Sequence, residues 1–89
     1  NPFEFALSQN YPNPFNPNTV ISYSIASEGN VTLKIFNSAG QQVSELVNAY
    51  QNAGIYNVEF NASSLSSGVY FYRLDANGFT ATNKMILVK

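Results

Sequence analysis

Residues 68–78 read GVYFYRLDANG, and this stretch decides the fold. It is dense in residues that favour strands, and successive residues of a strand alternate between its two faces with a period of two. One face carries Tyr70, Tyr72 and Leu74, and the other carries Val69, Phe71 and Arg73. The pair Asn77-Gly78 then predicts a tight hairpin turn, because both residues tolerate the left-handed backbone that such turns need.

The same alternation recurs on both sides of this hairpin, and Gly or Asn turns separate the segments. After the turn, the chain returns as a strand in which we expect Met85 and Leu87 to point inward. Residues 41–47 fit neither period, so a bulged strand and one helical turn both remain open there. The expected strands, including the two of this hairpin, are residues 19–25, 31–36, 55–60, 69–75 and 79–88.

Short strands at roughly ten-residue spacing predict an all-β fold, an Ig-like antiparallel β-sandwich of about seven strands. The sequence has no Cys and no Trp, so the Ig hallmark of paired Cys around a Trp is absent and only the architecture is implied. Strands 19–25 and 31–36 either pair as an antiparallel hairpin or are joined by a connection that crosses from one sheet to the other. In the Ser-rich loop 61–68, Leu65 is the one large apolar residue, and we expect it to plug an end of the core.

Residues 11–18 read YPNPFNPN and form the most unusual stretch of the chain. Proline fixes φ and favours extended geometry in the residue before it, so this stretch predicts a stiff segment that leads into strand 19–25. We expect Tyr11 and Phe15 to anchor the segment on the edge of the core. One interpretation is a structural clamp that also blocks pairing at a sheet edge. The other is a recognition surface for a partner protein.

Length and charge limit the possible functions. The chain has 89 residues, which is enough for one domain. Its formal net charge is -1, from four Lys or Arg and five Asp or Glu, so no basic field exists to attract nucleic acid or an anionic membrane surface. No run approaches the roughly 20 apolar residues of a membrane helix. We therefore expect neither nucleic-acid binding nor membrane insertion.

Catalytic chemistry has little support in the sequence. Without Cys or His, the chain lacks the residues for disulfides, zinc sites, thiol catalysis and most catalytic triads. The acidic residues have no metal-loop spacing, and no Gly-rich phosphate loop occurs. We expect no enzyme activity, no catalytic residue, no metal site and no cofactor.

Four motifs in order carry a family resemblance. They are the proline segment, VTLKIFNSAG at residues 31–40, SGVYFYRL at residues 67–74 and KMILVK at residues 84–89. Together they resemble the C-terminal sorting domain of type IX secretion substrates, over roughly residues 7–89. The chain is also similar to the Ig-like domain of the flagellar hook-capping protein.

The resemblance implies a β-sandwich appended to secreted hydrolases, adhesins and other surface proteins. Its implied partners are the type IX translocon, a surface sortase-like peptidase and an N-terminal cargo domain. The cargo would pass through the periplasm and across the outer membrane, to be secreted or held at the cell surface. The family's recognition positions map onto Pro12, Asn13, Pro14, Gly68, Tyr70, Lys84 and Lys89.

Recognition would use an edge strand, by preference the last one, through strand addition or charged side chains. We assign residues 11–89 to the C-terminal sorting domain and residues 1–10 to the end of a linker or an extra first strand. We expect a monomer. A second hypothesis is a structural or carbohydrate-binding accessory module of an extracellular enzyme, retained on the mature protein. A third is a hook-cap-like assembly module, which would self-associate.

Overall fold

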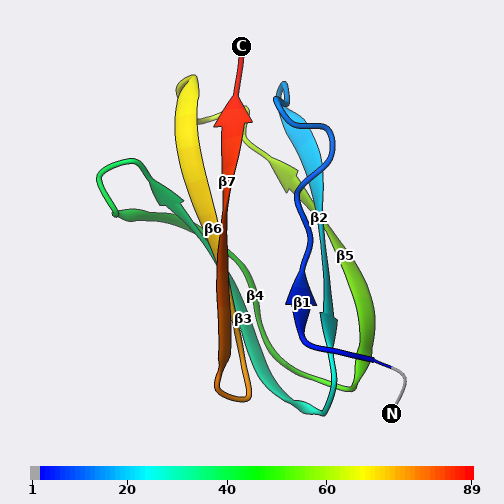
Figure 1. The fold of residues 1–89 in the computed structure, drawn as a ribbon. Helices are drawn as coiled ribbons and strands as arrows, with labels where there is room; N and C mark the ends of the chain where they lie inside the picture. Colours follow the sequence, from blue (N-terminus) through cyan, green and yellow to red (C-terminus); the bar gives the residue numbers. More distant parts are fainter. Residues whose placement is uncertain (1–2) are drawn as a thin grey trace.

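The computed structural model describes residues 3–89, which form seven strands in two antiparallel sheets (Figure 1). This confirms the predicted all-β sandwich of about seven strands. The strands are β1 (Ala6–Leu7), β2 (Asn18–Ile25), β3 (Gly29–Asn37), β4 (Gln42–Gln51), β5 (Gly54–Asn61), β6 (Gly68–Ala76) and β7 (Phe79–Leu87). Within this part of the chain, no helix is long and apolar enough to cross a membrane. Of the segment 1–10, residues 1 and 2 lie outside the described residues.

The sheets are joined by connections that cross between them. One sheet has the order β1-β2-β5 and the other has the order β4-β3-β6-β7. Because β2 and β3 belong to different sheets, the connection between them is a crossing and not a hairpin. The β6–β7 connection is the predicted tight hairpin, with Asn77 at φ 49° and Gly78 at φ 81°.

The core lies between the two sheets, and its residues come from the alternating inward positions of the strands. The predicted inward positions of Met85 and Leu87 on β7 are confirmed, because both side chains are buried. On β6 the buried face is the one with Tyr70, Tyr72 and Leu74. Leu65 is partly buried and packs against the core from the Ser-rich loop. The largest fully buried side chains include Phe15, Ile21, Tyr23, Ile25, Leu33, Ile35, Tyr72, Leu74, Met85 and Leu87.

Strand β4 resolves the ambiguity over residues 41–47 in favour of a bulged strand. Its register with β3 shifts between Leu33 and Lys34, which pair with Val47 and Glu45. Leu46 is therefore the extra residue of a bulge, and both Leu46 and Val47 pack against the core. Two neighbouring residues on the same side fit no strict period, which explains why the sequence pattern was ambiguous.

The turns at one end of the sandwich are tied together by Asn77. Its side-chain Nδ2 lies 3.1 Å from the carbonyl oxygen and 3.0 Å from the hydroxyl oxygen of Ser27, and 2.8 Å from the carbonyl oxygen of Glu28. Gly29 begins β3 directly against this amide, and a Cβ atom at position 29 would overlap Asn77 Oδ1. The β6–β7 hairpin thus holds the β2–β3 connection in place.

We expect Gly29→Ala to lower the free energy of unfolding by about 1–2 kcal/mol, because Asn77 must move and lose contacts with Ser27 and Glu28. Urea denaturation of the single and double variants measures this effect. In an Asn77→Ala background the cost of Gly29→Ala should largely disappear. An undiminished cost in that background would show that the glycine is required for another reason.

Candidate functional site

The N-terminal segment connects both sheets along one side of the sandwich (Figure 1). We call residues 8–17 the strap. It follows β1, which pairs with β2, and Tyr11 forms a further bridge to Val20 through two backbone hydrogen bonds of 3.0 and 2.9 Å. The strap then leaves this sheet and reaches β7 in the other one, where Phe15 forms a parallel bridge with Leu87.

The strap occupies the outer edge of the last part of β7. The amide nitrogen of Phe15 donates to the carbonyl oxygen of Ile86 at 3.0 Å, and its carbonyl oxygen accepts from the amide nitrogen of Val88 at 3.0 Å. The side-chain Oδ1 of Asn13 accepts from the amide nitrogen of Ile86, also at 3.0 Å. The clamp interpretation of the proline segment is therefore borne out at this edge. A partner strand could pair here only after the strap had moved away.

The two predicted anchors of the strap behave differently. Phe15 is an anchor, with 2% of its surface exposed, but the expectation for Tyr11 was wrong, because 80% of its surface is exposed. The reason is the bridge between Tyr11 and Val20. Directly paired residues in antiparallel strands lie on the same face, and Val20 is on the outer face of its sheet.

The strap is held to the core by the hydroxyl group of Tyr72, whose side chain is fully buried. This oxygen accepts a hydrogen bond from the amide nitrogen of Asn10 at 2.8 Å and donates one to the carbonyl oxygen of Ser8 at 2.7 Å. It also accepts from Asn83 Nδ2 at 3.3 Å. Burial raises the pKa of Tyr72, and the hydrogen bonds from Asn83 and Asn10 offset only part of that effect.

A second buried polar group shapes the strap from within. Asn10 is 2% exposed, and its Nδ2 donates to Thr19 Oγ1 at 2.9 Å and lies 3.2 Å from the carbonyl oxygen of Pro12. Thr19 Oγ1 donates to the same carbonyl oxygen at 2.9 Å. Sequence reasoning missed Asn10 and Thr19, because buried polar residues carry no pattern of their own. It placed Tyr72 on one face of a strand and gave its hydroxyl group no role.

Gly68 and Tyr70 both support the start of β6. Gly68 has φ +154°, a backbone conformation that side-chain-bearing residues rarely adopt, and it pairs with Leu87. The ring of Tyr70 is buried, and its hydroxyl group donates to the carbonyl oxygen of Ser66 at 2.6 Å. These two residues thereby fix the Ser-rich loop next to the end of β7.

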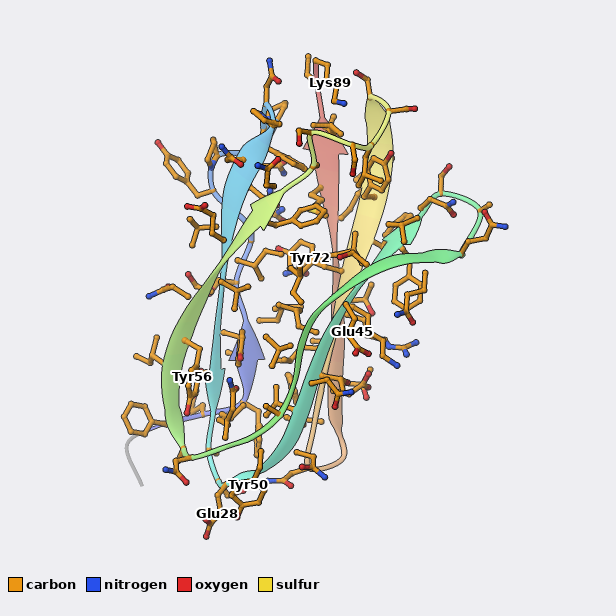
Figure 2. The ribbon with its side chains drawn as sticks, turned by 180° about the vertical axis from the view of Figure 1, so that it is seen from behind. Glu28, Glu45, Tyr50, Tyr56, Tyr72 and Lys89 are labelled. Atoms are coloured by element: carbon orange, nitrogen blue, oxygen red, sulfur yellow. The ribbon has the colours of Figure 1, made fainter. Side chains whose placement is uncertain are left out.

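The two terminal lysines face different surroundings. Lys84 is exposed on β7 opposite Phe71, and its carbonyl oxygen accepts from Gln9 Nε2 at 2.8 Å. Lys89 lies at one end of the sandwich, and Glu28 and Tyr50 lie at the other end (Figure 2). Its Nζ donates to the carbonyl oxygen of Ser63 at 2.7 Å.

The end of the sandwich where β7 finishes brings together most of the positions predicted from the resemblance. The strap and the Ser-rich loop meet β7 there, through Asn13 and Ile86 on one side and Gly68 and Leu87 on the other. Among residues 3–89, no group of acidic side chains could hold a metal ion, and every buried side-chain nitrogen or oxygen has a hydrogen-bond partner.

A model of the family described as the secretion system C-terminal sorting domain matches residues 9–89. The match begins within the strap and extends to Lys89, so it includes every position mapped from the resemblance. No curated protein and no solved structure gives a significant match.

We expect Tyr72→Phe to lower the free energy of unfolding by about 1–3 kcal/mol, because the buried amide of Asn10 would lose its acceptor and the carbonyl oxygen of Ser8 would keep only the donor Asn83 Nδ2, at 3.2 Å. Urea denaturation measures the change. Tyr56→Phe is a matched control, since the Tyr56 hydroxyl makes one exposed hydrogen bond, to the carbonyl oxygen of Asn52 at 2.6 Å. Equal losses in the two variants would contradict the role given to Tyr72.

The raised pKa of Tyr72 also predicts the pH dependence of stability. Its contribution is present in full below the ordinary tyrosine pKa of about 10 and is lost as pH rises through the higher pKa of the folded state, because the unfolded chain ionises first. Between neutral pH and about pH 11, the free energy of unfolding should therefore fall less steeply with rising pH for Tyr72→Phe than for the unchanged protein. Urea denaturation at a series of pH values measures it. Parallel curves for the two proteins would refute this assignment.

Proposed function

The chain belongs to the family of secretion system C-terminal sorting domains, and on this premise we propose that it directs an attached cargo across the outer membrane. Membership of the family implies a sorting signal for the type IX secretion machinery. The proposed cargo is joined on the N-terminal side and is delivered to the cell surface or the medium. The domain itself acts without catalysis, as a folded domain that the secretion machinery recognises.

The single observation that carries this proposal is the family match over residues 9–89. The arrangement of the chain supports it. The N-terminal and C-terminal ends of the described chain lie at opposite ends of the sandwich (Figure 1). A cargo attached before residue 3 would therefore leave the strap, the Ser-rich loop and Lys89 uncovered.

The proposed recognition surface comprises the positions mapped from the family. Because the strap already fills the outer edge at residues 86–88, the machinery reads side chains and turns there, and not an open strand edge. The residues exposed on this edge are Pro12, Asn13 and Pro14. Lys89 is bound to the Ser-rich loop through the carbonyl oxygen of Ser63. Gly68 and Tyr70 act by holding the loop in shape, and Lys84 adds a charge on the sheet face. After export, a surface sortase-like peptidase would remove the domain.

The accessory-module hypothesis gains no specific support from the exposed aromatic residues. A carbohydrate-binding strip needs neighbouring exposed rings. Tyr11 and Tyr50 are the most exposed tyrosines in the described chain, at 80% and 62%. Tyr11 is bridged to the early part of β2, whereas Tyr50 lies at the other end of the sandwich, where its hydroxyl group donates to Glu28 Oε2 at 2.7 Å.

A secretion assay tests the proposed function directly. Residues 1–89 are fused to the C-terminus of a fluorescent protein that carries a signal peptide, in bacteria with and without the type IX translocon. We expect the fusion at the surface or in the medium only when the translocon is present, and a shortened product if the domain is removed. Retention of a folded fusion in the periplasm of both strains would disprove the sorting role.

We further expect Lys84→Ala combined with Lys89→Ala to reduce export in this assay. Folding should survive, since exposed charges contribute less than about 1 kcal/mol to stability. A melting curve of the purified variant verifies this. Lys84→Arg with Lys89→Arg is the matched control and should restore export by restoring the charge. Full export of the alanine variant would refute lysine recognition without affecting the sorting role itself.

A further inference from the structure

The outer face of the four-stranded sheet carries a hollow, and we propose that it binds the carboxylate of an acidic peptide segment from a protein partner. The hollow has a volume of about 290 Å³. Its walls are formed by Phe36, Phe71, Arg73 and Thr82, and the β3–β4 turn closes one side. This proposal is independent of the sorting role.

Two phenyl rings and a guanidinium group form the centre of the hollow. Phe36 and Phe71 are directly paired across β3 and β6, so their side chains share the outer face. The guanidinium carbon of Arg73 lies 5.0 Å from the centre of the Phe36 ring, a cation–π contact that holds the charged group over the ring. The hollow therefore offers an apolar wall beside a positioned positive charge.

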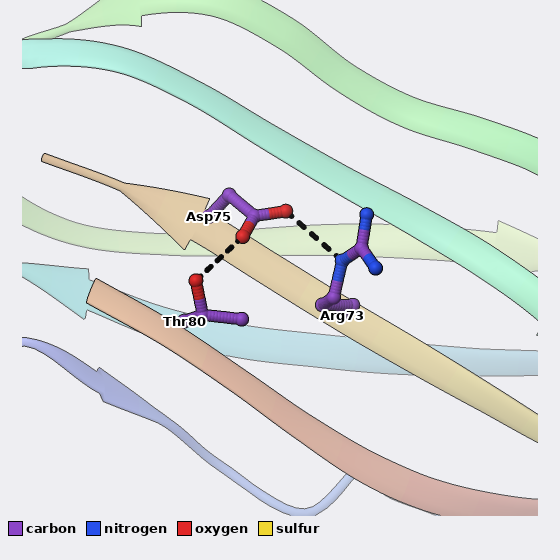
Figure 3. A network of polar contacts seen from close by, with 3 residues as sticks. All are labelled: Arg73, Asp75 and Thr80. Carbon is purple, nitrogen blue, oxygen red and sulfur yellow. Dashed lines mark hydrogen bonds and ion pairs between the residues drawn. The ribbon is translucent and has the colours of Figure 1, made fainter. Parts of the chain in front are cut away.

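Arg73 is held in place through only one of its nitrogen atoms. Its Nε donates to Asp75 Oδ2 at 3.0 Å, and the other oxygen of Asp75 accepts from Thr80 Oγ1 at 2.7 Å (Figure 3). Figure 3 shows a contact with Asp75 from Nε alone, and no hydrogen bond from the two terminal nitrogens of Arg73 is found within residues 3–89. Those two nitrogens form the planar pair of donors that binds a carboxylate through both of its oxygens.

The acidic neighbour of Arg73 does not remove this positive character. Desolvation acts to raise the pKa of Asp75, but the hydrogen bond from Thr80 and the charges of Arg73 and Lys34 together lower it below its ordinary value. Asp75 is therefore ionised, and both of its oxygens already accept hydrogen bonds. It positions Arg73 and leaves the free nitrogens available to a ligand.

Three of the four basic residues of the chain lie on this face. Lys34 is directly opposite Arg73 on β3, and Lys84 is directly opposite Phe71 on β7. Neither ammonium group makes a hydrogen bond to any residue in the described part of the chain. Glu45, which pairs with Lys34 on β4, accepts from Asn48 at 3.3 Å. Lys34, Arg73 and Lys84 therefore face two carboxylates on this side of the sheet, Asp75 and Glu45, and the remaining positive charge complements an anionic ligand.

The geometry favours a peptide carboxylate over an acidic sugar. A sugar ring binds to an aromatic platform through an open ring face, but the guanidinium of Arg73 occupies a face of Phe36. The hollow is also at the small end of the range for ligand sites, roughly 300–1,000 Å³. It has room for a Glu or Asp side chain and part of an apolar neighbour. Phe71 and Phe36 would contact that neighbour while Arg73 binds the carboxylate.

The test uses blocked peptides and the full 89-residue chain. Acetyl-Phe-Glu-Ala-amide is titrated into isotope-labelled protein, and amide shifts and the Arg73 Nε–H shift are followed by NMR. We expect saturable shifts confined to the hollow. The matched peptide with Gln in place of Glu should bind about threefold to tenfold more weakly, because it lacks the charge.

Protein variants locate the interaction. Arg73→Gln should weaken binding of the Glu peptide about threefold to tenfold, whereas Lys89→Gln removes the same charge elsewhere and should leave binding unchanged. Equal binding of the Glu and Gln peptides to the unchanged protein would overturn the proposal, even if Arg73→Gln failed to fold. Tighter binding of glucuronate than of the Glu peptide would also overturn it, in favour of an acidic saccharide.

Discussion

The buried hydroxyl group of Tyr72 is the constraint on which the position of the strap depends. A hydroxyl group enclosed by a core must find partners inside the protein, and here Ser8, Asn10 and Asn83 supply them. The hydrogen bonds of this one oxygen hold the strap against β6 and β7. With the strap fixed, Phe15 enters the core and Asn13 reaches the edge of β7. One polar atom thus links strand packing to the shape of the candidate recognition surface.

The closed edge of β7 bears on how a partner can recognise this domain. Open edges invite pairing by any extended chain, which makes them poorly selective and prone to aggregation. Here the amide nitrogens of Ile86 and Val88 are already used by the strap. Under the proposed function, recognition would depend on the side chains and the shape of the strap, which are specific to the sequence. A sorting domain benefits from that arrangement, because its edge is closed to non-specific pairing.

The sequence predicted what local patterns can encode. Period-two alternation identified the inward residues of β7 and grouped Tyr70, Tyr72 and Leu74 on one face of β6, because a strand places every second residue on the same side. It failed where long-range register decides. The exposure of Tyr11 follows from its pairing with Val20, and the burial of Asn10 follows from Tyr72, which is 62 residues away in the chain. The hollow beside Arg73 likewise depends on the pairing of Phe36 with Phe71. The roles of the seven mapped recognition residues remain predictions that the fold makes testable.

The parallel contact between the strap and β7 has a mechanical consequence. The molecule is about 40 Å long, and its chain ends lie at opposite ends of that length. A pull on the two ends would draw the strap and β7 in opposite directions along their common axis. The bonds of Asn13 and Phe15 to β7 would then be loaded in shear, all at once and not one after another. A domain of this design resists being unravelled by a load on its N-terminal side while it is held at its C-terminal end.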